Sequence, residues 1–67
     1  MNFSKTIKEL REQHNYTQAF VAEKIGIRQS SYNKYEADKS RPEYENLVKL
    51  AKLYEVSIDF LLGKEEF

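Results

Sequence analysis

The chain has 67 residues, so it forms one domain near the lower size at which a hydrophobic core is stable alone. It contains no cysteine, which excludes disulfides and thiolate metal sites as supports for that core. No apolar run approaches the ~18 residues of a membrane span, and the first residues lack the apolar segment of a signal peptide. We therefore expect a soluble cytoplasmic chain that has no membrane partner.

The net charge is zero, but the charges are unevenly distributed along the chain. Residues 1–42 contain eight Lys or Arg against five Asp or Glu, whereas residues 43–67 contain three against six. This asymmetry favours a basic binding end and an acidic far end.

The hydrophobic pattern of the first part of the chain is helical. Phe3, Ile7 and Leu10 recur at helical spacing and predict a first helix over about residues 4–13. Thr17 is the expected N-cap of a second helix. No alternating run typical of a strand occurs here or later, so the expected fold class is all-α.

A third helix follows the second after only a few residues. Gly26 is suited to the left-handed turn that ends the second helix. In the following segment, "RQSSYNKYE", Tyr32 and Tyr35 are expected to face inward. Two helices joined by a short connection with Gly at its centre are typical of a helix-turn-helix, here at about residues 17–36, although ordinary helical hairpins share this pattern.

Two further helices are predicted after a polar loop. In that loop Asp38 is expected to adopt a left-handed conformation, which Asp tolerates better than most residues. Pro42 and Glu43 introduce the fourth helix, and Ser57 caps a short fifth helix that Gly63 ends. The apolar stripe expected on the fourth helix comprises Tyr44, Leu47, Val48, Ala51 and Tyr54.

A series of short motifs extends over nearly the whole chain in a specific order. They are Leu10-Arg11, Thr17-Gln18, Val21-Ala22, Ile25-Gly26, Tyr35-Glu36, Pro42, Leu47, Leu50-Ala51, Val56-Ser57 and Leu61-Leu62. In this order and spacing the chain resembles the Cro/repressor-type helix-turn-helix family, also called XRE-like or lambda-repressor-like. The resemblance implies a compact five-helix bundle that binds double-stranded DNA, with residues 1–67 as a single domain and 63–67 as a short C-terminal tail.

The chain departs from the family pattern at three helix ends. Family members often have Ser or Thr at the cap before the third helix, where this chain has Arg28. That helix is therefore expected to begin within one residue of Arg28. Gly is common in the family at the positions of Asp38 and Glu55, so Glu55 is either strained or part of a rebuilt turn.

The third helix carries side chains suited to reading base pairs. Each base pair presents its own pattern of hydrogen-bond donors and acceptors in the major groove, and Arg, Gln, Asn and Ser can match it. The side chains expected to face the groove are Arg28, Gln29, Ser30, Asn33 and Lys34. The resemblance places the base-reading positions of the family at the last four of these. Gln29 can pair with adenine, and Arg28 with guanine or a phosphate; the alternative is that all five are solvated surface residues.

Phosphate contacts are expected beside the third helix, because helix starts and cations bind phosphates. Gln18 lies at the start of the second helix, where family members commonly hold the DNA backbone. Lys39, Ser40 and Arg41 lie in the loop that usually follows the opposite strand; the alternative is a solvated charged loop.

The resemblance also implies an ion pair between Arg11 and Glu36. Together with the inward-facing Tyr35, this pair is expected to support the third helix. The alternative is two unrelated exposed charges.

The resemblance further implies a transcriptional regulator, a repressor that binds a palindromic operator as a homodimer. Phe60, Leu62 and Phe67 are the candidates for the dimer interface. An antitoxin-like or protein-interaction subunit with the same fold is the alternative.

The single histidine, His14, is expected to lie at the end of the first helix, and no paired carboxylates or spaced metal ligands occur. We therefore expect no catalytic site, no metal and no cofactor.

Overall fold

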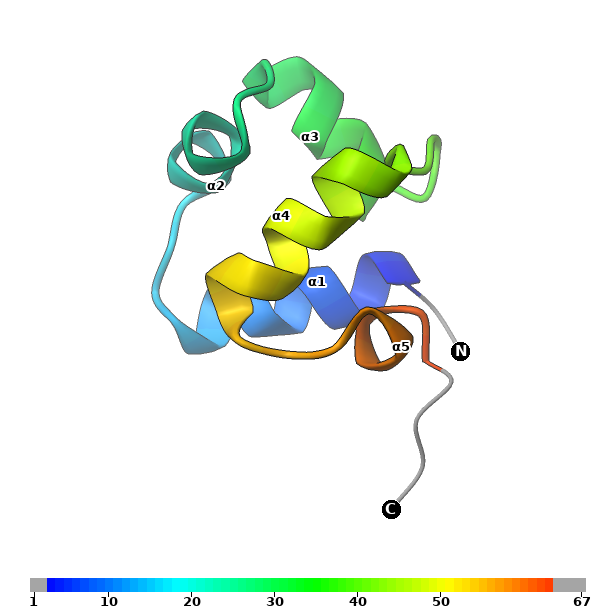
Figure 1. The fold of residues 1–67 in the computed structure, drawn as a ribbon. Coiled ribbons are helices and arrows are strands. Elements are labelled where there is room, and N and C mark those ends of the chain that lie inside the picture. The colour runs from blue at the N-terminus through cyan, green and yellow to red at the C-terminus, as the bar shows by residue number, and fades with distance from the viewer. Residues whose placement is uncertain (1–2, 64–67) are drawn as a thin grey trace.

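The computed structural model describes residues 3–63, which form five helices and no strand (Figure 1). The helices are α1 (Phe3–Gln13), α2 (Gln18–Ile25), α3 (Gln29–Glu36), α4 (Tyr44–Tyr54) and α5 (Ile58–Leu61). The predicted all-α architecture is confirmed. α1 begins at Phe3, one residue earlier than predicted, and the Phe3 side chain is part of the core.

A single hydrophobic core connects the five helices. Its largest fully buried side chains are Ile7, Val21, Ile25, Tyr32, Leu50 and Leu61, and each helix contributes at least one of them. α3 packs against both α1 and α2, while α4 packs against α2 and α5. Figure 1 shows α3 at one end of the molecule, with α4 crossing between it and α5. α3 is therefore anchored on its inner side by two helices.

The expected stripe on α4 was wrong at one end. Tyr44 is 72% exposed, and the buried residues of this helix are Leu50, Ala51 and Tyr54. All three lie in the second half of α4, whereas Tyr44 opens its first turn. A helical period identifies the face of a helix that is apolar, but it does not show how far along the helix the core extends.

Local signals in the sequence set most of the helix ends. The backbone N–H of Phe20 donates to the Thr17 hydroxyl at 3.0 Å, and that of Phe60 donates to the Ser57 hydroxyl at 2.9 Å. Both predicted N-caps are therefore present, and each provides a partner for an N–H that the helix itself leaves unpaired. Gly26 ends α2 at φ 78°, in the left-handed region.

The three departures from the family pattern are resolved as follows. α3 begins at Gln29, and Arg28 occupies the N-cap in an extended conformation without a capping hydrogen bond from its side chain. Asp38 and Glu55 both adopt the left-handed conformation, with φ of 61° and 57°. The turn after α4 is therefore not rebuilt, and Glu55 adopts a conformation that is more favourable for glycine.

Candidate nucleic-acid interface

The connection between α2 and α3 is the short turn that places the two helices at a fixed angle. The N–H of Gly26 donates to the Glu23 carbonyl, and the N–H of Ile27 donates to the Ala22 carbonyl at 2.9 Å. These bonds pair carbonyls at the end of α2, and Ile27 then packs partly against the core. α2, this turn and α3 form a helix-turn-helix.

The two sides of α3 differ sharply in burial. Tyr32 is fully buried and Tyr35 is 7% exposed, so both tyrosines anchor the helix as predicted. The five side chains that were expected to read bases are all exposed: Arg28, Gln29, Ser30, Asn33 and Lys34. α3 therefore combines an inner side fixed in the core with an outer side of flexible hydrogen-bonding groups.

The predicted pair between Arg11 and Glu36 is present and links α1 to the end of α3. The Nε of Arg11 donates to Oε2 of Glu36 at 2.7 Å, and Nη2 donates to Oε1 at 3.0 Å. The two side chains are 14% and 4% exposed. Nη1 of the same arginine donates to the carbonyl oxygen of Tyr16 at 3.0 Å, before α2 begins. This bidentate arrangement fixes three segments of the chain to one another.

Two further donors to Glu36 were not foreseen from the sequence. The Tyr32 hydroxyl donates to Oε2 of Glu36 within α3, and Nε2 of Gln18 donates to Oε1 at 3.0 Å from the start of α2. The four-residue spacing of Tyr32 and Glu36 on one helix was a usable signal for the first contact. The contact of Gln18 depends on how α2 crosses α3, and no local pattern reports that angle.

The same contacts control the ionisation of the cluster. Burial acts to raise the pKa of Glu36, but hydrogen bonds from Arg11, Tyr32 and Gln18 outweigh it and hold this pKa below its ordinary value of 4.5. The bond to Glu36 raises the pKa of Arg11, and burial together with the bond to Glu36 raises the pKa of Tyr32. At neutral pH the cluster therefore contains a carboxylate, a guanidinium and a neutral phenol.

The loop after α3 carries the predicted phosphate-contacting cations. Lys39 and Arg41 are exposed, and Ser40 is half-buried. The N–H groups of Lys39 and Ser40 donate to the carbonyl of Lys34, which folds the loop back onto the last turn of α3. Arg41 lies 4.0 Å from the Asp38 carboxylate, and both side chains are largely exposed, so this contact leaves the guanidinium accessible.

These features agree with a family-level comparison. The sequence model of a family described as "Helix-turn-helix" matches residues 7–61 of the chain. The chain belongs to this helix-turn-helix family. The match covers α2, the turn and α3, and it confirms the resemblance identified from the motifs.

Three curated relatives of the chain are named as transcriptional regulators or repressors. The uncharacterized HTH-type transcriptional regulator YobD of Bacillus subtilis is 46% identical over 91% of this chain and 54% of its own length. ImmR, an HTH-type transcriptional regulator of the same organism, is 44% identical over 98% and 52%. The cryptic phage CTXphi transcriptional repressor RstR of Vibrio cholerae is 44% identical over 96% and 57%. The chain thus spans about half the length of these relatives.

Solved structures confirm the lambda-repressor-like fold. The P22 c2 repressor protein in complex with a synthetic operator superposes with a TM-score of 0.90 and 25% identity, covering 97% of this chain and 98% of the repressor chain. A transcriptional regulator from Listeria innocua superposes with a TM-score of 0.91 and 24% identity, covering 98% and 62%. Both structures therefore share the fold of this chain over nearly its whole length.

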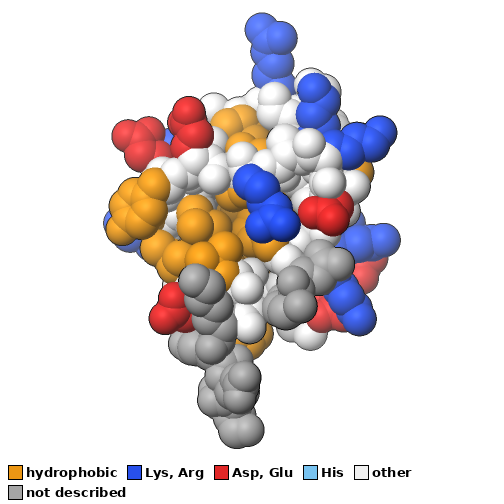
Figure 2. Space-filling view, turned by 90° about the vertical axis from the view of Figure 1, so that its right-hand side faces the viewer, with side chains coloured by type: hydrophobic (Ala, Val, Ile, Leu, Met, Phe, Trp, Pro, Cys, Tyr) orange, Lys and Arg blue, Asp and Glu red, His pale blue; other side chains and the backbone are white. Residues whose placement is uncertain are grey.

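Two of the three candidates for a dimer interface lie in or directly after α5. Phe60 and Leu62 are half-buried and pack partly against the core, so each leaves some apolar surface accessible. Phe67 lies outside the described residues. Figure 2 shows hydrophobic side chains gathered towards the left of the face in view, while most Lys and Arg side chains lie towards its top and right.

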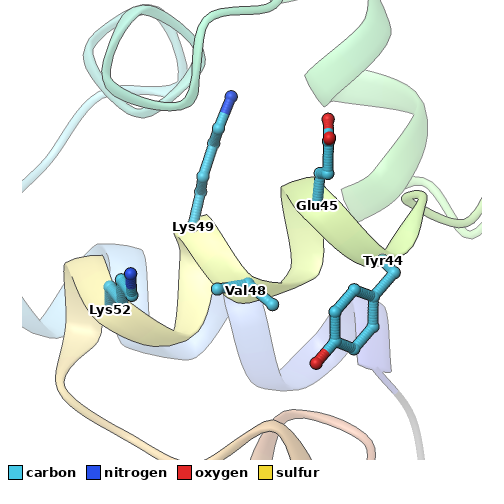
Figure 3. Close-up of a pocket in the computed structure, with 5 residues that line it drawn as sticks. All are labelled: Tyr44, Glu45, Val48, Lys49 and Lys52. Atoms are coloured by element: carbon cyan, nitrogen blue, oxygen red, sulfur yellow. The ribbon is translucent and has the colours of Figure 1, made fainter.

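The outer surface of α4 carries a separate shallow pocket of about 460 Å³. Figure 3 shows the side chains that line it, which are Tyr44, Glu45, Val48, Lys49 and Lys52. The Lys49 ammonium reaches the carbonyl of Ile25 at 3.4 Å, at the end of α2. None of the residues predicted to contact DNA lines this pocket, so it is distinct from the candidate interface.

The described part of the chain offers little that suggests other chemistry. No three His, Cys, Asp or Glu side chains in residues 3–63 are grouped so as to hold a metal ion. His14 lies just beyond α1, with Nδ1 2.8 Å from the Leu10 carbonyl oxygen, which is a structural contact at a helix end. Of the helices in this part, none has the length and apolar character needed to cross a membrane.

Proposed function

We propose that the chain is a sequence-specific, double-stranded DNA-binding transcriptional regulator in which α3 enters the major groove. The observation that carries this proposal is the contrast between the two sides of α3. Two buried tyrosines fix the helix, and every polar side chain needed for reading bases is exposed. The names of the relatives and the operator bound to the P22 c2 repressor support the same function.

Within this proposal the residues of α3 read bases. Gln29 and Asn33 lie one helical turn apart on the exposed side, and their amides can pair with the edge of adenine. Arg28 precedes the helix and reaches guanine or a phosphate, while Ser30 and Lys34 complete the reading surface. Gln18, Lys39, Ser40 and Arg41 contact phosphates and fix the orientation of α3.

Loss of a base-reading amide is expected to relax sequence preference. Gln29→Ala and Asn33→Ala should each reduce discrimination by about 1–3 kcal/mol at the base pair that the residue reads, with the fold intact. The measurement is a selection of bound duplexes from a random pool, followed by affinity measurements on single-base variants of the selected site. Ser31→Ala, at an exposed position of α3 with no assigned role, is the matched control.

Three outcomes of this selection differ in meaning. Full sequence preference in both the Gln29 and the Asn33 variants contradicts the assignment of the reading surface. Failure of the parent chain to bind any duplex, even at low salt, contradicts DNA binding itself and favours a role as a protein-interaction subunit. Relaxed preference in both variants but not in the Ser31 variant supports the assignment.

We further propose that the chain acts as a repressor and occupies DNA as a symmetric dimer joined through its C-terminal end. A single recognition helix covers only a few base pairs, and a two-fold symmetric dimer doubles the site. Such a dimer requires an approximately palindromic operator whose half-sites are centred about 34 Å apart. The half-buried Phe60 and Leu62, together with Phe67, supply the apolar side chains for this contact.

Charged substitutions at this interface are expected to produce monomers. Sedimentation of the parent at high concentration should show a dimer, whereas Phe60→Glu and Phe67→Glu should shift the chain towards the monomer and reduce operator occupancy. Tyr44→Glu is the control, because Tyr44 is exposed on α4 and lies outside the proposed interface. A parent that stays monomeric and occupies its operator as a single copy contradicts the dimer.

A further inference from the structure

The Glu36 carboxylate is a junction of three helices. It accepts hydrogen bonds from Arg11 on α1, from Gln18 on α2 and from Tyr32 on its own helix, α3. Oε2 accepts from Arg11 Nε and the Tyr32 hydroxyl, while Oε1 accepts from Arg11 Nη2 and Gln18 Nε2. A carboxylate offers about four lone-pair positions, so both oxygens of Glu36 are fully used.

This junction determines the orientation of the Gln18 amide. The amide nitrogen has to face Oε1 of Glu36, because a reversed amide would place its oxygen against an oxygen of a carboxylate. Gln18 is the first residue of α2 and is half-buried. Its second N–H is consequently held in one direction rather than distributed over several rotamers, at the position proposed to contact a phosphate.

The Tyr32 hydroxyl differs from the arginine as a partner of Glu36. The tyrosine side chain is fully buried in the core, so its hydroxyl is a donor at a fixed place. Arg11 reaches the carboxylate through a long side chain that is 14% exposed. Because a buried aromatic ring has little freedom to move, the hydroxyl fixes the rotation of the carboxylate that Gln18 contacts.

We propose that Tyr32 is a positioning residue for DNA binding, which acts through Glu36 to hold the Gln18 amide in the orientation that donates to a phosphate. The inference rests on the proposed function, because it assumes that Gln18 contacts DNA. Without the Tyr32 hydroxyl, Oε2 has one donor fewer, and only the long, partly exposed Arg11 side chain and Gln18 itself still restrain the rotation of the carboxylate. The bond between Glu36 and Gln18 then no longer selects a single orientation of the amide.

A double-mutant cycle between Tyr32→Phe and Gln18→Ala tests the proposal. The probe is a mixed-sequence duplex at low salt, because a phosphate contact does not depend on sequence. Each single substitution is expected to weaken binding by roughly 3- to 10-fold, the scale of one hydrogen bond. In the Gln18→Ala background, Tyr32→Phe should produce no further loss.

Two additional measurements separate positioning from general stability. Tyr35→Phe keeps the ring that anchors α3 and removes a hydroxyl whose partner is Asn46 on α4 rather than Glu36, so it should leave duplex affinity unchanged. The side-chain amide resonance of Gln18 in a ¹H–¹⁵N spectrum of the DNA-free protein should shift in Tyr32→Phe but not in Tyr35→Phe. Circular dichroism confirms that each variant is folded before binding is measured.

The outcomes distinguish this proposal from the proposed function. A loss from Tyr32→Phe that disappears in the Gln18→Ala background supports it, as does a shift of the Gln18 amide resonance. Equal losses in both backgrounds, or no loss in either, overturn it while leaving DNA binding in place. A parent chain that binds no duplex overturns the proposed function and this inference together.

Discussion

Replacement of Arg11 by Met is expected to lower the free energy of unfolding by about 3 kcal/mol, because it leaves a buried carboxylate without its counter-charge. The Glu36 side chain is only 4% exposed, and Arg11 provides two of its four hydrogen bonds. Met keeps the aliphatic part of the arginine and removes the charge, so the change reports on the pair rather than on lost packing.

The size of this effect is large for such a small chain. Domains are stable by roughly 0.05–0.15 kcal/mol per residue, which gives about 3–10 kcal/mol for a chain of this length. Loss of the pair is therefore expected to remove between about a third and nearly all of that stability. Urea denaturation followed by far-UV circular dichroism measures the change. Arg41→Met is the matched control. The Arg41 side chain is 70% exposed and comes no closer than 4.0 Å to the Asp38 carboxylate, so this ion pair contributes little to stability.

A double-mutant cycle measures the interaction energy between Arg11 and Glu36 separately from the contribution of each side chain alone. Glu36→Leu should also destabilise the fold, because it leaves the Arg11 guanidinium without its partner. The double substitution Arg11→Met with Glu36→Leu should cost less than the two single changes added together. Additive losses would show that the pair contributes nothing beyond its separate side chains.

Acid provides a second test of the same pair. The pKa of Glu36 in the folded chain lies below its ordinary value of 4.5, so its contribution to stability is complete above that value. The contribution is lost as the pH falls through the lowered pKa, because the unfolded chain then binds a proton more readily than the folded chain. The double variant lacks this carboxylate and should lose less stability than the parent over that acidic range.

The helix ends and the identity of α3 could be predicted from the sequence because the signals for them are local. Thr17, Ser57 and Gly26 act through their own or neighbouring backbone groups, and the structure confirms their positions. The burial of Tyr32 and Tyr35 followed from their spacing. The exposure of Tyr44 could not be predicted, since it depends on where the core ends along α4 rather than on helical period.

The Glu36 cluster shows where prediction from local pattern fails. Arg11 and Glu36 are 25 residues apart, and only the resemblance to a family suggested that they meet. The Gln18 contact was missed because it requires the crossing of two helices to be known to within an ångström or so. The resemblance assigns Gln18 to a phosphate contact, and the structure shows that its amide donates a hydrogen bond to Glu36 within the protein.

Duplex affinity is expected to fall steeply with salt although the chain has no net charge. The relevant charge is local, because counterions are released only from the phosphates that a cation approaches. Three cations, Arg28, Lys39 and Arg41, are exposed at or just beyond the ends of α3. A dimer would bring about six such cations to the DNA. The expected slope of log K against log salt is then on the order of −5.

Such a slope corresponds to a loss of about 10³-fold in affinity between roughly 50 and 200 mM salt, which fluorescence anisotropy over a KCl series can measure. Lys39→Ala should weaken all duplexes about equally and make the slope of the dimer shallower by about 2, since one cation is lost from each protomer. Lys52→Ala is the matched control, because Lys52 is exposed on the outer surface of α4 and lines the pocket there. Binding that is independent of salt, or an equal change of slope in the Lys52 variant, would show that these cations do not lie against the phosphates. If Lys52→Ala has the same salt slope as the parent and Lys39→Ala has a shallower slope, the DNA lies along the loop that follows α3.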